Sequence, residues 1–168
     1  MKIRNLLASM ATLLLLACSG TRGPRITSTL PDVSSDATTD VIRELVLRDL
    51  MAQHSPTAGG ARSATCFVSF EDRIDPSPSF LDRLAGACAV VKPWSQRNRE
   101  PSHLPAALPD ERSFIEFDVG PIEWRGDREA ELEARYYCGL LCAGGYRYHV
   151  AWTAAGWVVS ASSLLWIS

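Results

Sequence analysis

The cysteines beyond residue 60 are the side chains whose type and spacing could do chemistry in this chain. Cys138 and Cys142 bracket the segment CGLLCAGG, while Cys66 and Cys88 lie earlier in the sequence. A redox enzyme would use a thiolate of lowered pKa, usually in a Cys-x-x-Cys motif at a helix N-terminus. Here three residues separate the two later cysteines, and the surrounding pattern predicts the end of a β-hairpin. We therefore expect structural disulfides in an oxidising compartment, and no redox catalysis.

Four cysteines allow three disulfide pairings. We favour Cys138 with Cys142 and Cys66 with Cys88, because each pair is close along the chain and the second would join two neighbouring strands. A zinc site that combines these cysteines with His149 is disfavoured, since the strand alternation puts His149 on the opposite face from Cys138. We predict no metal and no cofactor.

The segment around the later cysteine pair is a candidate recognition loop. A disulfide between Cys138 and Cys142 would close a very short loop, so its contribution to stability should be small and its value would lie in shaping the loop. Glycines in and after it allow backbone conformations that are closed to other residues. The loop is either a rigid, exposed recognition element or a plain structural staple. Its candidate residues are Gly139, Leu140, Leu141, Gly144 and Gly145.

Carboxylates gather on one predicted sheet face and could do acid–base work or hold a cation, although such a face is more often simply solvated. Matching the inward residues of neighbouring strands puts Asp118 opposite Arg135, but Glu123 opposite Glu131, a mildly unfavourable pair. No serine, histidine and acid fall into a recognisable nucleophile motif. We assign no catalytic residue. The carboxylates of this face are Glu116, Asp118, Glu123, Glu131 and Glu133.

The N-terminus has the organisation of a secretory signal. Lys2 and Arg4 precede an apolar stretch over 6–17, which is too short to cross a bilayer because a spanning helix needs roughly 20 apolar residues. A charged start, a short apolar middle and a small residue before the cut are the parts of a cleaved signal peptide. We expect residues 1–17 to be removed.

The ending Leu15-Leu16-Ala17-Cys18 resembles the lipobox of bacterial lipoproteins. The resemblance implies that the Cys18 thiol carries lipid and that Cys18 is the mature N-terminus. Several acyl chains hold a protein where a single chain binds only reversibly. Ser19, rather than an aspartate, follows the cysteine, which implies sorting to the outer membrane with the domain facing the periplasm. The alternative is an ordinary cleaved signal with a chance cysteine.

Charge and composition beyond the signal limit the partners. Removal of Lys2 and Arg4 leaves 15 of the 17 basic side chains against 19 acidic ones, a formal charge of −4. Binding of nucleic acid needs clustered positive charge, so this class of partner is excluded. Residues 18–39 are mostly Ser, Thr, Pro, Gly and Asp, which predicts an acylated cysteine followed by a flexible tether. Residues 40–168 have the length of one domain.

The first part of the domain predicts helices and short strands. The segment DVIRELVLRDLMAQH has helical spacing of apolar residues, with His54 as a favourable charge at its end. Thr65 to Phe70 reads as a strand, a short helix follows an N-cap at Ser77, and a second short strand covers Cys88 to Val91. The apolar positions of the long helix are Val41, Ile42, Leu45, Val46, Leu50 and Met51.

The last third of the chain predicts four strands with short connections, which favours an antiparallel meander. The alternation changes phase at Gly120-Pro121, where a bulge is expected, and Gly156 suits the left-handed position of a hairpin loop. One helix face needs a sheet to cover. We predict an α+β fold with a curved antiparallel sheet against the long helix. The inward residues are Ile115, Phe117, Leu132, Tyr136, Tyr148, Val150 and Trp152, with Trp124 and Trp157 or Trp166 also expected in the core.

This outline is similar to cystatin-like and nuclear-transport-factor-like folds in topology only. The segments YYCGLLCAGGYRYHV, GWVVS and WIS also resemble the C-terminal region of uncharacterised bacterial secreted proteins and lipoproteins. Neither resemblance implies catalytic residues. We therefore favour a non-catalytic binding or interaction lipoprotein with an unknown protein or small-molecule partner. An enzyme or small-ligand binder with an aromatic pocket between helix and sheet is the alternative, and a purely structural envelope protein is the third class.

Overall fold

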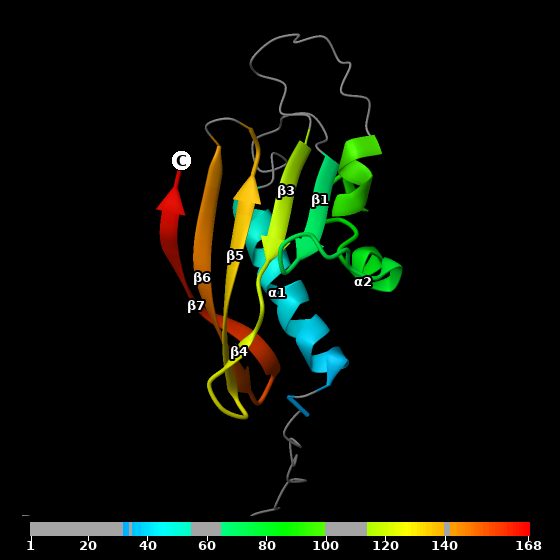
Figure 1. Cartoon of the computed structure of the whole chain (residues 1–168). Helices are drawn as coiled ribbons and strands as arrows, with labels where there is room; N and C mark the ends of the chain where they lie inside the picture. Colours follow the sequence, from blue (N-terminus) through cyan, green and yellow to red (C-terminus); the bar gives the residue numbers. More distant parts are fainter. Residues whose placement is uncertain (1–31, 34, 55–64, 100–113, 140–141) are drawn as a thin grey trace, which may run out of the picture.

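A computed structural model describes residues 32–33, 35–54, 65–99, 114–139 and 142–168 (Figure 1). The predicted α+β fold is confirmed, with one long N-terminal helix on a sheet. Cys18, Leu140 and Leu141 lie outside the described residues, as do the signal segment and most of the tether. The elements in chain order are α1 (Asp36–His54), β1 (Thr65–Phe70), α2 (Pro78–Arg83), β2 (Val90–Pro93), the 3-10 helix η2 (Trp94–Arg99), β3 (Phe114–Val119), β4 (Glu123–Trp124), β5 (Glu129–Tyr137), β6 (Ala143–Thr153) and β7 (Gly156–Ile167).

The sheet is mixed. Its strand order is β2-β1-β3-β5-β6-β7, with β4 paired to β5. The C-terminal part is the predicted antiparallel meander, whereas β1 runs parallel to both β2 and β3, so the expectation of a fully antiparallel sheet is wrong. The chain returns through α2 after β1 and through η2 after β2. Such crossovers, unlike hairpins, bring the next strand back in the same direction.

The predicted phase change at Gly120-Pro121 is a real bulge. Val119 pairs with Ala134 and Glu123 pairs with Glu131, so the chain advances four residues on one side and three on the other. The Gly120 N–H donates to the Glu133 carbonyl across the interruption at 2.8 Å. Asp118 lies opposite Arg135, as predicted.

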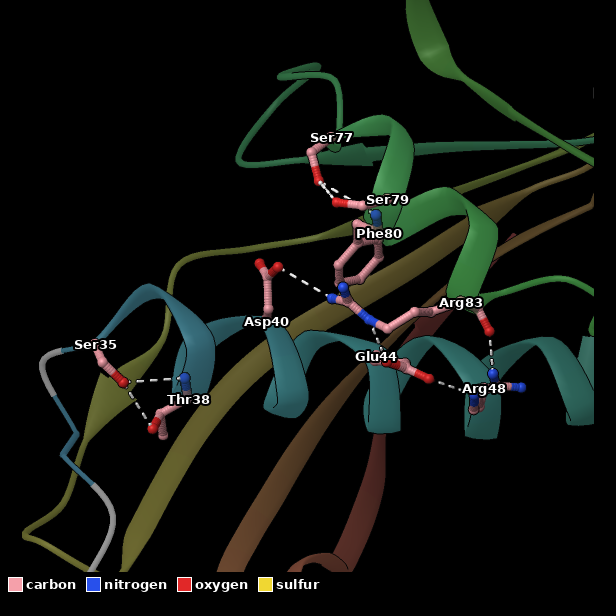
Figure 2. Close-up of polar contacts among 9 residues, drawn as sticks. All are labelled: Ser35, Thr38, Asp40, Glu44, Arg48, Ser77, Ser79, Phe80 and Arg83. Atoms are coloured by element: carbon pink, nitrogen blue, oxygen red, sulfur yellow. Dashed lines mark hydrogen bonds and ion pairs between the residues drawn. The ribbon is translucent and has the colours of Figure 1, made fainter.

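The helix α1 begins earlier than the sequence pattern indicated. Ser35 acts as its N-cap, because the Ser35 hydroxyl accepts a hydrogen bond from the Thr38 N–H at 3.2 Å (Figure 2). Residues 36–39, assigned to the tether from their composition, therefore belong to the helix. The missed signal was this serine cap, which lies six residues before Val41, the first apolar residue of the predicted stripe.

The core lies between α1 and the sheet face that α1 crosses in Figure 1. Most of the apolar positions predicted for the long helix are buried. Val41 is an exception, with 45% of its surface exposed, and Leu47, which was not predicted, is buried in the core. The inward strand residues Ile115, Phe117, Leu132, Tyr136, Tyr148 and Val150 are buried as predicted, and Trp152 is half-buried. Of the two tryptophans offered for the core in β7, Trp157 is buried and Trp166 is 46% exposed.

The short helix α2 is fixed against α1 by one ring and one guanidinium. Phe80 is fully buried, and its N–H donates to the Ser77 N-cap hydroxyl at 3.2 Å. Arg83 donates to Asp40 at 3.0 Å and to Glu44 at 2.8 Å, as Figure 2 shows. Arg48 also donates to Glu44, and to the Arg83 carbonyl. These contacts tie α2 to the exposed side of α1.

Within the described segments, no helix combines the length and the apolar character needed to cross a bilayer.

Candidate binding site on the outer sheet face

Two disulfides are present, and both follow the expected pairing. Cys66 is bonded to Cys88 with a Cα–Cα distance of 6.2 Å, and Cys138 to Cys142 with a Cα–Cα distance of 5.1 Å. The first links β1 to the segment just before β2, and both of its cysteines are buried. Disulfides persist in oxidising compartments, so they indicate an extracytoplasmic domain.

The candidate recognition loop is smaller than predicted. Gly139 lies in the connection between β5 and β6 with a φ of +129°, a left-handed conformation that favours glycine. Gly144 and Gly145 lie in β6 instead, where they pair with Tyr136 and Arg135 and are buried. They are therefore strand residues and not part of an exposed tip.

The two strand glycines make room for aromatic rings on opposite faces of the sheet. A Cβ at Gly144 would lie 2.8 Å from the Tyr136 ring, and a Cβ at Gly145 would lie 2.7 Å from Cε2 of Trp166. Tyr136 points into the core, whereas Trp166 lies on the outer face and remains 46% exposed. A glycine pair reads as a turn in a sequence, which is why this role was missed.

The sheet face opposite α1 carries the predicted carboxylates, but arginines neutralise it. Four arginines hold the predicted set in ion pairs: Arg97 with Glu116, Arg135 with Asp118 at 3.0 Å, Arg125 with Glu123 at 2.9 Å and with Glu131 at 3.1 Å, and Arg147 with Glu133 at 2.8 Å. Glu123 does lie opposite Glu131 as predicted, and the Arg125 guanidinium bridges the two carboxylates. Its hydrogen bond lowers the pKa of Glu131.

Two hollows on this face join into one surface, which we call the outer trough. The first has a volume of about 480 Å³ and extends from Glu123 and Arg125 to Trp166. The second, of about 580 Å³, extends from Trp166 to Trp94 in η2. The hollows share Asp72, Asp118, Arg135 and Trp166, so they are continuous.

A tight loop after β1 forms one wall of the outer trough. Glu71, Asp72 and Arg73 have φ values of 45°, 62° and 89°, a left-handed run that is uncommon without glycine. Phe70 and Ile74 exchange two backbone hydrogen bonds of 2.8 Å that close the loop. Strain of this kind clusters at functional sites. The residue types Glu, Asp and Arg gave no sequence signal for it.

The loop projects charged side chains to both sides. Asp72 forms an ion pair with Arg135 in the outer trough, and Glu71 forms one with Arg43 of α1. The Arg73 guanidinium lies 4.8 Å from the centroid of the Trp94 ring, a cation–π contact that holds the tryptophan at the end of the outer trough.

His54 does not act as the charged helix cap expected from its position. Its ring stacks on Tyr136 with a centroid distance of 3.9 Å and lies near Tyr146. Burial lowers the pKa of His54, and the Asp49 charge only partly opposes this effect. The neutral imidazole is therefore favoured. His149 lies on the outer face as predicted, 3.4 Å from Glu131.

The alternative of an aromatic pocket between helix and sheet gains no support from the packing. Tyr148, Leu50 and Met51 are fully buried in that interface, and both hollows described above lie on the other face. In the part of the chain that the structure describes, His, Cys, Asp and Glu form no group of three that could hold a metal ion.

Comparison of the chain with protein-family models, with curated proteins and with solved structures finds no match. The resemblances to lipoproteins and to cystatin-like and nuclear-transport-factor-like folds stay predictions.

Proposed function

We propose that this chain is a lipid-anchored, extracytoplasmic binding module without catalytic activity, and that the outer trough is its binding surface. The lipid on Cys18 would hold it at the outer membrane facing the periplasm, with residues 19–35 as the tether. Its partner is a protein or small molecule of the envelope.

The ion pairing in the outer trough is the observation that carries this proposal. Each of the six carboxylates that line the first hollow is paired with an arginine: Glu71, Asp72, Asp118, Glu123, Glu131 and Glu133. The hydrogen bond from Arg125 lowers the pKa of Glu131, whereas a general acid at neutral pH needs a raised pKa. Such a surface is suited to holding a ligand by fixed hydrogen bonds.

The compartment is supported by two independent features. Both disulfides require an oxidising environment to form and persist. The N-terminal sequence before Cys18 has the parts of a signal peptide, which would deliver the chain to that environment.

Site-specific photocrosslinking in intact cells tests the binding surface. A photoreactive amino acid that replaces Trp166 or Tyr137 in the outer trough should give an adduct with an envelope component. The same amino acid in place of Ala52, which is exposed on α1, is the matched control and should give none. Adducts from Ala52 alone, or no adduct from either trough position, would contradict the proposal.

A further inference from the structure

We propose that the outer trough binds an uncharged oligosaccharide. This inference rests on the proposed binding function and specifies its ligand class. Three features of the described residues carry it: balanced charge, unused hydrogen-bonding capacity, and aromatic rings that are at least partly exposed.

The charges of the outer trough nearly cancel. Both hollows together are lined by seven carboxylates, the six named above and Glu116. Six arginines face them: Arg73, Arg125, Arg135 and Arg147 in the lining, and Arg43 and Arg97 as ion-pair partners from outside. Five of these arginines are already paired with carboxylates, and Arg73 lies over the Trp94 ring, so an anionic ligand would have to compete for most of them. A cationic ligand would compete with the same arginines for the carboxylates. A neutral ligand can bind without breaking these ion pairs.

The paired groups keep donors and acceptors for a ligand. A carboxylate offers about four acceptor positions and a guanidinium five donors, so one ion pair uses only part of either. At Asp118, one oxygen accepts from the Ser69 hydroxyl at 2.5 Å and the other from Arg135 at 3.0 Å. A sugar hydroxyl donates and accepts at once, so it can bridge the carboxylate and the guanidinium of one pair without adding charge.

Two tryptophan rings provide apolar surface on which a sugar ring can pack. Trp166 lies opposite Gly145 in the middle of the outer trough, and the missing Cβ lets its indole approach the strand. Trp94 lies at the end of the second hollow, half-buried and backed by Arg73. The C–H face of a sugar ring packs on such rings, while its hydroxyls reach the ion pairs.

The outer trough is long enough for several sugar units. It follows β5 from Glu131 to Tyr137, six residue steps, or about 20 Å at the rise of a β-strand. Outward side chains that can form hydrogen bonds recur at every second residue of that strand: Glu131, Glu133, Arg135 and Tyr137. A linear oligosaccharide matches this shape better than a compact ligand.

Titration of the full chain with soluble tetrasaccharides, followed by NMR, tests the ligand class. The panel contains uncharged α- and β-linked hexose and N-acetylhexosamine tetrasaccharides, with a sulfated tetrasaccharide and spermidine as charged comparisons. We expect saturable shifts of the Trp166 indole N–H with at least one uncharged sugar and none with the charged probes. Binding of only a charged probe, or of no probe, would overturn the inference.

Variants on the two sides of one strand locate the site. Trp166→Ala should weaken sugar binding about tenfold. Gly145→Ala should weaken it similarly, because the new Cβ displaces the indole while the tryptophan remains. Leu164→Ala is the matched control: Leu164 is 54% exposed on the same strand but pairs with Tyr146 towards the inner face, so binding should not change. Equal effects of Trp166→Ala and Leu164→Ala would overturn the assignment.

A variant of Trp94 tests the same site independently, in case the Trp166 variant does not fold. Trp94→Ala, at the other end of the outer trough, should also weaken binding while the unfolding transition stays cooperative. Unchanged affinity in a folded Trp94 variant would contradict a site that spans both hollows. If no sugar binds but crosslinking from Trp166 captures a protein, the oligosaccharide inference fails and the binding function stands; if neither occurs, both fail.

Discussion

Gly144 has a packing role that a single added methyl group would disrupt. A Cβ there would lie 2.8 Å from the Tyr136 ring, which is itself buried. Gly144→Ala should therefore lower the free energy of unfolding by about 1–3 kcal/mol, the usual cost of overpacking. Denaturant unfolding measures it. In a Tyr136→Val background the same substitution should cost much less, and equal costs in both backgrounds would contradict this packing.

His54 should make stability depend on pH. Burial lowers its pKa in the folded state, so the unfolded chain binds more protons below the ordinary value of 6.5. The contribution of neutral His54 is complete above that value and is lost as the pH falls toward the folded pKa. We expect wild type to lose more stability than His54→Asn between pH 7.5 and 5.5. Parallel stability curves for the two proteins would contradict the burial of His54.

Residue-level features were predictable where a strict period fixed them. The alternation of strand residues put Asp118 opposite Arg135 and His149 on the outer face, because the side-chain period in a strand is two. The loop over 71–73 and the outer trough were not predictable. They depend on how the loop after β1 lies in space against the outer faces of β5 and β7, and no residue type in the loop requires its conformation.

The element α2 is held chiefly by its ring rather than by its ion pairs. Phe80 is fully buried, so Phe80→Ala should lower the free energy of unfolding by about 3–5 kcal/mol. Arg83 is 41% exposed and its ion pairs are screened by water, so Arg83→Gln should cost less than about 1 kcal/mol. Chemical denaturation of both variants compares them. A larger loss from Arg83→Gln would show that the ion network anchors the helix.

The two disulfides should contribute unequally. Cys66 and Cys88 are 22 residues apart, whereas Cys138 and Cys142 are four apart, and loop-closure entropy grows with the length of the closed loop. Replacing the first pair by alanines should cost about 3 kcal/mol and replacing the second about 2 kcal/mol. Thermal unfolding of the two double variants tests this order. The reverse order would mean that the short loop has a larger structural role than chain entropy gives it.

Elements were predicted where they are local and missed where they depend on distant partners. The Ser77 cap, Pro78 and the apolar period placed α2 and most of α1 because helix signals lie within a few residues. The parallel pairing of β1 with β2 and β3 was missed, since strand direction depends on connections longer than a hairpin. The second half of β7 is exposed, including Trp166, which was one of the two tryptophans of this strand offered for the core.

For the whole molecule, anchoring depends on one thiol. If Cys18 carries lipid, Cys18→Ala should leave an unprocessed precursor and abolish labelling of the protein by a fatty-acid analogue. A Ser19→Ala variant, one residue away, is the matched control and should still be labelled. Unchanged labelling and membrane association of Cys18→Ala would contradict the lipoprotein assignment.

We infer that the sheet face opposite α1 is the binding surface of the molecule. Chemical-shift mapping of the full chain in a fractionated envelope extract tests it most directly. Trp166, Trp94 and the side chains of Arg135 and Arg147 should shift together, because all line the outer trough. Residues on the exposed side of α1, such as Ala52, should not shift. Shifts confined to α1 and α2, or absent from the outer trough, would contradict the claim.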